Sequence, residues 1–268
     1  RLLMATPLES MLAVRARSER PDVRLLSLAM SRHPIYLRYV ADVFADDARA
    51  RGLAEAGLDA VLGDWFARDP SVTSRVVTVD VPDVWRLGGW VACPGHWTYR
   101  GVAAPDRDAL RARWAAFPTW TSRFSRACAQ LDGLPPAFQP YAAWLRRYVS
   151  RLMNDFGFLL EETGLTAEAL AAYETSAAFD PEQYSARHNR ARLAHQLGRP
   201  EAEAARAELE RWLQLRASMF NPVEAVHRGG RIRHPTLQLA DTFRSARAGL
   251  LDFALSSLTE LLQQQEQS

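Results

Sequence analysis

The chain has 268 residues, 48% of them hydrophobic and 24% charged, which is the composition of a folded globular protein and not of a disordered one. Its 33 basic side chains, all arginine, nearly balance 31 acidic ones, so the excess basic charge typical of a nucleic-acid-binding protein is missing. No apolar run approaches the roughly 18 to 20 residues of a membrane-spanning helix, and no signal peptide is recognisable. Because an apolar strand pattern follows Arg1 directly, we expect the chain to be a mature or excised part of a longer polypeptide.

Short β-type runs alternate with helical patterns in the first hundred residues. Strands are expected at 2–5, 23–28 and 75–81, with a closing hairpin at 90–92 and 97–102, and helices at 7–18, from His33-Pro34 onward, and at 58–66. Strands separated by helices pair in parallel through right-handed crossovers. We therefore predict that residues 1–104 form a small α/β domain with a parallel, Rossmann-like sheet.

After Pro105 the β-type signal disappears, and residues 105–268 are predicted to form an all-helical domain. One helix is expected over 106–131 and another from about Tyr141, with Pro135-Pro136 between them. An amphipathic segment at 236–262 is expected to cover the far end of the helical stack.

A helix-turn-helix repeat is visible from Ser150 to Gln183. Small, aromatic and turn-forming residues stand at its eighth, fifteenth, twentieth, twenty-fourth, twenty-seventh and thirty-second positions, namely Gly157, Gly164, Ala169, Tyr173, Ser176 and Pro181. This pattern resembles the tetratricopeptide repeat of about 34 residues, in which small side chains let two helices approach closely. Thr166 is expected to cap the second helix, and Asp180-Pro181 to end it.

A second unit over 184–217 keeps the turn glycine, Gly198, in register. Resemblance to tetratricopeptide proteins implies that the first helix of each pair lines a groove for a protein partner. The corresponding polar and aromatic positions are Arg151, Asn154, Phe158 and Glu161 in the first unit and Ser185, His188, Asn189, Arg192 and His195 in the second. Asn189 matches an asparagine that holds a peptide backbone or carboxylate in such grooves. The alternative is that these side chains are solvated or packed against the rest of the chain.

A second candidate site lies at the carboxyl ends of the predicted strands, where open α/β sheets bind ligands. His33, Asp80 and Asp83 are expected near this edge, and two carboxylates with a histidine could perform acid-base chemistry. These residues also have a structural interpretation: His33 and Asp83, for example, stand where helix caps belong. No glycine-rich phosphate loop and no nucleophile elbow occurs, so no cofactor is predicted.

Two further motifs have weaker interpretations. Cys93 and His96 resemble half of a metal site, but a tight turn explains the Pro-Gly between them and no partner pair follows, so no metal is predicted. The basic run 227–234 could meet an anionic surface or an acidic partner, and the alternative is a solvated connecting loop. A bridge between Cys93 and Cys128 is left open.

The segment RPDVRLLSLAMSRHPIY, residues 20–36, resembles a segment of polytopic glycosyltransferases similar to protein O-mannosyltransferases. Thr6-Pro7-Leu8 and the run from Asp83-Val-Trp-Arg to Tyr99-Arg100 extend the resemblance. In that family the segment opens a soluble extracytoplasmic region behind the membrane spans, and tetratricopeptide units commonly follow. The resemblance implies a periplasmic, membrane-associated location, with a cytoplasmic one left open, and catalysis by membrane helices that this chain lacks.

Together these patterns predict a non-catalytic interaction module that binds a protein partner in a membrane assembly. One alternative is the acceptor-binding domain of a membrane glycosyltransferase. Another is an enzyme whose site lies near His33 and Asp80.

Overall fold

The protein is described from a computed structural model, which covers the chain in ranges separated by gaps. The described residues are 2–5, 24–27, 30, 33–69, 71, 76–78, 90–93, 96–99, 106–133, 135–218, 220–221, 229–234, 237–239, 242–243, 246, 255, 258–259 and 261–262. The chain divides into two compact units, residues 1–82 with 96–103, and residues 83–95 with 104–268. The sequence placed a boundary after 104, whereas residues 83–95 belong to the helical unit.

The strands are short and form a sheet in the order β2-β1-β3-β5-β4. Their bounds are β1 Leu2–Ala5, β2 Arg24–Ser27, β3 Val76–Thr78, β4 Trp90–Cys93 and β5 His96–Tyr99. β1 pairs in parallel with both β2 and β3, but β3 pairs antiparallel with β5. The predicted parallel, Rossmann-like domain is therefore not supported: the sheet is mixed, because only two residues separate β4 from β5 and the chain must reverse there.

Helices lie between β2 and β3 along the chain, as the sequence predicted. They are α2 Pro34–Val43, α3 Ala48–Leu53, the short 3₁₀ helix η1 Ala54–Ala56, and α4 Leu58–Arg68. Asp47 caps α3 by accepting hydrogen bonds from the amides of Arg49 and Ala50. Val40, Leu58 and Leu62 are fully buried, so these helices share a small apolar core. The predicted helix at 7–18 lies outside the described residues.

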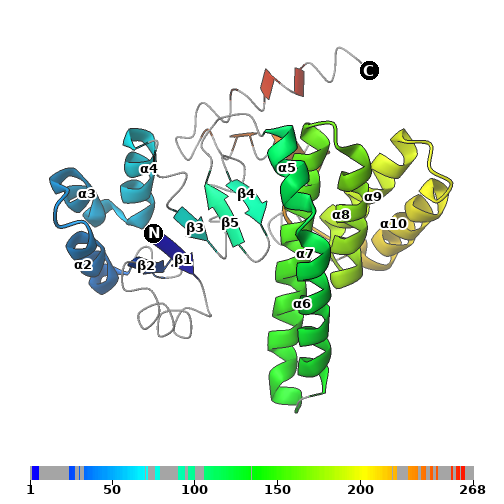
Figure 1. Cartoon of the computed structure of the whole chain (residues 1–268), viewed down its shortest axis with the longest axis horizontal. Helices are drawn as coiled ribbons and strands as arrows, with labels where there is room; N and C mark the ends of the chain where they lie inside the picture. Colours follow the sequence, from blue (N-terminus) through cyan, green and yellow to red (C-terminus); the bar gives the residue numbers. More distant parts are fainter. Residues whose placement is uncertain are drawn as a thin grey trace. The chain divides into compact units, whose positions relative to one another are not determined.

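The second unit is helical over most of its described length (Figure 1). Its helices are α5 Arg107–Trp114, α6 Phe117–Asp132, the 3₁₀ helix η4 Pro136–Phe138, α7 Gln139–Glu162, α8 Thr166–Phe179, α9 Tyr184–Gln196 and α10 Ala202–Arg216. The single helix expected over 106–131 is in fact two, because Pro118 lies in the first turn of α6, where a missing N–H costs little, and would break a continuous helix.

The helices from α7 to α10 pack in chain order, α8 on α7, α9 on α8 and α10 on α9 (Figure 1). Gly164 and Gly198 have φ of 74° and 60°, which non-glycine residues rarely adopt, and each stands in the turn between two helices, as predicted. The predicted cap at Thr166 is wrong, because Thr166 is the first residue of α8, whose N-cap, Leu165, makes no side-chain cap. Two successive helical hairpins are thus present at 139–179 and 184–216.

A buried hydrogen-bond network fastens α7 to α8 and to the start of α9. The hydroxyl of Ser150 donates to the carbonyl of Ser176 across 2.7 Å, and the hydroxyl of Ser176 donates to the carbonyl of Ser150 across 2.5 Å. Ser176 also contacts Gln183, the N-cap residue of α9, at 2.6 Å. Because all three residues are buried, the network holds the three helices in one register.

Candidate functional site

Most of the residues predicted to line a groove on α7 and α9 are not solvated. Arg151, Asn154, Phe158 and Asn189 are buried, with 9%, 0%, 3% and 0% of their surface exposed. Glu161, His188 and Arg192 are half-buried, and His195 is exposed. Something in the chain must therefore cover this surface.

The cover is residues 229–234, Gly-Gly-Arg-Ile-Arg-His, called the inner segment below. It lies against the side of α7 and α9 that carries Asn154, Asp155, Phe158, Glu161, Glu162, Ser185, His188 and Asn189, called the α7–α9 face below. The solvated-loop interpretation of the basic run is therefore wrong for residues 229–234, of which Gly229, Gly230 and Ile232 are buried.

Two carboxamides at the centre of the α7–α9 face bind the main chain of the inner segment. Asn154 Nδ2 donates to the carbonyls of Gly229 and Arg231 across 3.1 and 2.8 Å. Asn189 Nδ2 donates to the same Arg231 carbonyl and to Asn154 Oδ1, both across 3.0 Å. Asn189 Oδ1 accepts from the amide of Arg233 across 3.0 Å. All four N–H hydrogens of the two carboxamides are therefore used, and they bind peptide groups independently of the peptide's side chains.

Other side chains complete the binding of the main chain. Asp155 accepts a hydrogen bond from the amide of Arg231 across 3.0 Å, and the hydroxyl of Ser185 donates to the carbonyl of Gly230 across 3.1 Å. His188 Nε2 donates to the carbonyl of Arg233 across 3.2 Å. Asp155 was missing from the predicted set. It stands at the sixth position of its repeat, as Asn189 does in the next, so the repeat register was a signal that could have found it.

The two arginines of the inner segment share one aromatic ring and separate carboxylates. The guanidinium carbons of Arg231 and Arg233 lie 4.0 and 4.5 Å from the centroid of the Phe158 ring. Arg231 contacts Glu162 at 3.3 Å, and Arg233 contacts Glu161 at 3.1 Å. Each arginine is thus held by a cation–π contact and an ion pair together.

Glu161 is the centre of a wider charged cluster. Besides Arg233 it contacts Arg192 at 2.6 Å, and it accepts a hydrogen bond from the hydroxyl of Tyr173 across 3.0 Å. Its side chain is only 10% exposed. Glu161 and Arg192, both predicted as groove residues, are therefore brought together as an ion pair that also holds the inner segment.

Ile232 points into an apolar cluster on the α9 and α10 side. It is 3% exposed and packs with Tyr184, Trp212 and Leu237, with Leu209, Leu213 and Phe220 around them. Leu237, from the segment predicted to cover the stack, is buried in this cluster, whereas Phe243 and Leu258 of the same segment are exposed. The aliphatic side chain between the two arginines is thus buried in a cluster of aromatic and leucine side chains.

The two glycines allow the inner segment to approach the helices closely. A Cβ on Gly230 would overlap Asp155 Oδ1, and φ at this residue is 84°. A Cβ on Gly229 would lie 2.8 Å from the hydroxyl oxygen of Ser185. A side chain at either position would therefore push the segment off the helices.

His188 is held neutral in this site. Burial lowers its pKa to about 4, and the neighbouring His234 and Arg192 act in the same direction, while the Arg233 carbonyl favours the protonated form. Its ring centroid lies 5.5 Å from that of His234. At neutral pH the ring thus acts as a hydrogen-bond donor and not as a charge.

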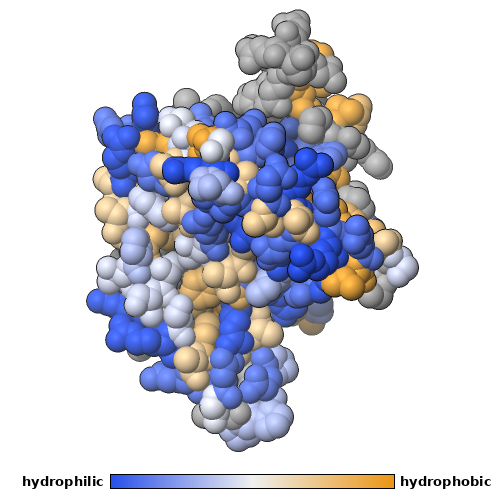
Figure 2. Space-filling view, turned by 90° about the vertical axis from the view of Figure 1, so that its right-hand side faces the viewer, coloured by the Kyte–Doolittle hydropathy of each residue, from blue (hydrophilic) through white to orange (hydrophobic). Residues whose placement is uncertain are grey.

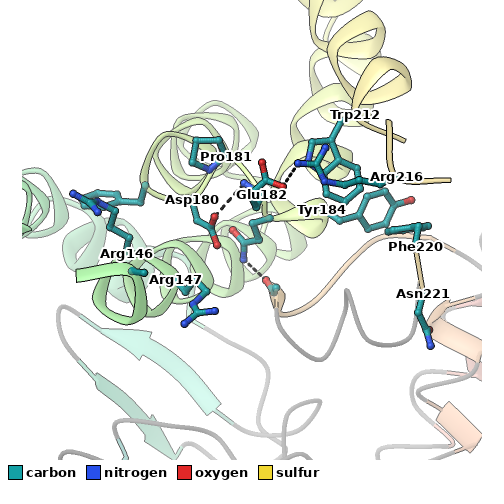
Figure 3. Close-up of a pocket in the computed structure, with 14 residues that line it drawn as sticks. Arg146, Arg147, Asp180, Pro181, Glu182, Tyr184, Trp212, Arg216, Phe220 and Asn221 are labelled. Atoms are coloured by element: carbon teal, nitrogen blue, oxygen red, sulfur yellow. Dashed lines mark hydrogen bonds and ion pairs between the residues drawn. The ribbon is translucent and has the colours of Figure 1, made fainter. Parts of the chain in front are cut away.

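A cavity of about 520 Å³ adjoins the inner segment at Gly229 (Figure 3). Arg146 and Arg147 lie on one side of it, and Tyr184, Trp212 and Phe220 on the other (Figure 3). Arg216 and Glu182 form an ion pair in its wall. Burial raises the pKa of Asp180 in the same wall. The lining of the cavity thus carries side chains of both charges, three arginines and two carboxylates.

The strand-edge site is only partly described. His33 is the N-cap residue of α2, as its structural interpretation predicted, but its side chain makes no capping hydrogen bond and is exposed. Asp80 and Asp83 lie outside the described residues, so their relation to His33 stays a prediction.

Cys93 and Cys128 are both free and buried, so the bridge left open by the sequence is not formed. Within the described ranges, no group of three or more His, Cys, Asp or Glu side chains is placed to hold a metal ion. Cys93 instead accepts a contact from Arg113 Nη1 at 3.0 Å.

Among the helices of the described part of the chain, none is both long and apolar enough to cross a membrane. Comparison with protein-family models, with curated proteins and with solved structures finds no match to the chain. The resemblance of residues 20–36 to the O-mannosyltransferase-like enzymes therefore stays a prediction.

Proposed function

We propose that the chain is a non-catalytic protein-interaction module with tetratricopeptide-like repeats, whose α7–α9 face binds an extended peptide main chain. The observation that carries the proposal is the pair Asn154 and Asn189, whose carboxamides bond to the peptide groups of residues 229, 231 and 233. Carboxamides both donate and accept, so they suit an extended main chain, which presents N–H and C=O groups in turn.

The surroundings of this face favour binding over chemistry. The polar groups at its centre are engaged with peptide groups, and His188 is a neutral donor with a pKa of about 4, far from the value that suits a general base near neutral pH. The side of the molecule seen in Figure 2 is mainly hydrophilic, with hydrophobic patches between the hydrophilic residues. These features support the α7–α9 face as the place where a partner binds.

The partner that we propose is a protein of a membrane assembly on the extracytoplasmic side. This part of the proposal is supported by residues 20–36 and their resemblance to the soluble region of O-mannosyltransferase-like enzymes. The same resemblance supports a second candidate, an acceptor-binding domain of a membrane glycosyltransferase. Sugar transfer by the isolated chain, abolished by Asp80→Ala, would instead favour an enzyme.

Site-specific photo-crosslinking tests the proposed function. A photoreactive amino acid at His195, exposed on α9, should crosslink a membrane protein when the chain is mixed with native membranes. The matched control is the same amino acid at Gln130, exposed on α6. Equal labelling from both positions would contradict a partner site on the α7–α9 face, and labelling from neither would contradict a partner in the membrane.

A further inference from the structure

We propose that the peptide recognised by the α7–α9 face has the pattern Gly-Gly-Arg-aliphatic-Arg, and that the inner segment is an intramolecular copy of this ligand which a partner must displace. This inference rests on the proposed function and names the partner's chemistry. The inner segment, seated by hydrogen bonds to its main chain and by a separate site for each side chain, is the template from which the pattern is derived.

At positions 231 and 233 the α7–α9 face favours arginine by its charge and by its planar shape. At each, a guanidinium lies over Phe158 and contacts a carboxylate, Glu162 for the first and Glu161 for the second. A planar guanidinium can stack and form ion-pair hydrogen bonds at once, whereas a lysine ammonium is a compact, strongly hydrated charge. A glutamate at either position would meet Glu161 or Glu162 and be repelled.

The position between the arginines is selected by the apolar cluster. Ile232 is buried among Tyr184, Trp212 and Leu237, so a charged residue there would lose its water without gaining a partner. The two positions before the arginines are selected by space, because a Cβ there would collide with Ser185 or Asp155. Five consecutive positions are therefore restricted, by charge, by apolar burial or by space.

An intramolecular ligand lowers the apparent affinity for a partner. A segment tethered to its own site is present at an effective concentration that reaches the millimolar range for short flexible linkers. The apparent dissociation constant for an outside peptide is the intrinsic constant divided by the fraction of faces left open. Weakening the inner segment should therefore strengthen binding of an added peptide.

The test uses the full chain and a fluorescent peptide with the sequence of residues 227–235, HRGGRIRHP. In the variant Arg231→Glu/Arg233→Glu, the inner segment is weakened while the α7–α9 face is intact, and fluorescence anisotropy should show the peptide binding at least about tenfold more tightly than to the unchanged chain. Peptides with both core arginines replaced by glutamate, or with Val in place of the second glycine, should not bind.

Each outcome decides a different point. No binding to a variant that retains its helical circular dichroism would overturn the inference and make the inner segment a permanent part of the fold. Equal binding of the glutamate peptide would overturn the arginine pattern but leave the proposed peptide-binding function standing. Failure of the crosslinking at His195 together with tight peptide binding would instead count against a membrane partner.

A second measurement covers the case in which the double variant does not fold. Excess peptide added to the unchanged chain should displace the inner segment, whose Arg231 and Arg233 amides would lose Asp155 and Asn189 as acceptors. Hydrogen exchange of these two amides, followed by mass spectrometry, should then become faster with HRGGRIRHP but not with the glutamate peptide. Unchanged exchange at saturating peptide would overturn the displacement.

Discussion

Asn189 Nδ2 donates to Asn154 Oδ1 across 3.0 Å, and both side chains also donate to the carbonyl of Arg231. The two asparagines belong to successive helical hairpins, α7 and α9, and are completely buried. Their contact joins the hairpins and the inner segment into one hydrogen-bonded unit.

Asn189→Ala should lower the free energy of unfolding by about 1–3 kcal/mol, because the Arg231 carbonyl loses one of its donors and the part-buried Arg233 amide loses its acceptor. Urea denaturation followed by helical circular dichroism measures the change. Gln130→Ala, on the exposed surface of α6, is the control and should leave the midpoint unchanged. Similar midpoints for the two variants would show that the carboxamide pair does not stabilise the unit.

Glu161→Gln should be more costly than the loss of a surface ion pair. The carboxylate is 10% exposed and holds Arg192 and Arg233, so its neutralisation leaves two half-buried guanidiniums without their counter-charge, at about 3 kcal/mol. Glu210→Gln is the matched control, since its pair with Arg206 is exposed on both sides and should contribute little. Thermal unfolding at low and high salt distinguishes the two, and the Glu161 effect should persist at high salt.

Gly157→Ala should destabilise the contact between α7 and α8. The added Cβ would lie 2.8 Å from Cε1 of Tyr173 and 3.2 Å from the Cβ of Ala172, and the Tyr173 side chain is fully buried. Overpacking of this kind costs about 1–3 kcal/mol. Gly133→Ala meets only the Gln130 carbonyl at 3.5 Å and is the control. Equal melting temperatures for Gly157→Ala and Gly133→Ala would contradict the prediction, because they would mean that α7 and α8 can move apart at little cost.

Stability should fall on acidification because of His188. Its pKa is about 4 in the folded chain against 6.5 as the ordinary value, so between these values the unfolded chain binds more protons. The neutral form therefore contributes stability that is present above about pH 6.5 and is lost as the pH falls towards 4, up to about 3 kcal/mol.

His188→Gln keeps a donor near the Arg233 carbonyl but cannot titrate. The difference in unfolding free energy between this variant and the unchanged chain should shrink or reverse from pH 7 to pH 4.5, measured by urea denaturation at each pH. Parallel pH profiles of the two proteins would show that His188 is not responsible.

The helices were predictable where local sequence decides the backbone. The glycines of the two turns, Gly164 and Gly198, have the positive φ that their positions in the repeat indicated. The division between α5 and α6 was missed because Trp114, Phe117 and Trp120 keep helical spacing across it, and apolar periodicity does not register a break of two residues. The short hairpin at residues 90–102 already implied that one of its two strands runs antiparallel to the rest of the sheet. The prediction of a parallel sheet did not take this into account, and β5 is antiparallel to β3.

The candidate site was predictable only on one side. Asn154, Glu161 and Asn189 stand on the face that the repeat register indicated. The inner segment was interpreted as a basic, solvated loop because the side chains that bind it lie far away in the sequence. Asn154, for example, donates hydrogen bonds to residues 75 and 77 positions later. Hydrogen bonds to a main chain leave no signature in the side chains of the segment that receives them.

The helical hairpins, the turn glycines and the positions of the two asparagines were predictable from the sequence, since these depend on interactions within a few turns of helix. That residues 229–234 lie on those asparagines depends on contacts between distant parts of the folded chain. A Gly-Gly-Arg-Ile-Arg sequence can lie exposed to solvent, or it can pack against a surface that carries carboxylates and an aromatic ring. The choice between them is made by long-range burial of Ile232 and pairing of two arginines with Glu161 and Glu162, which no local pattern encodes.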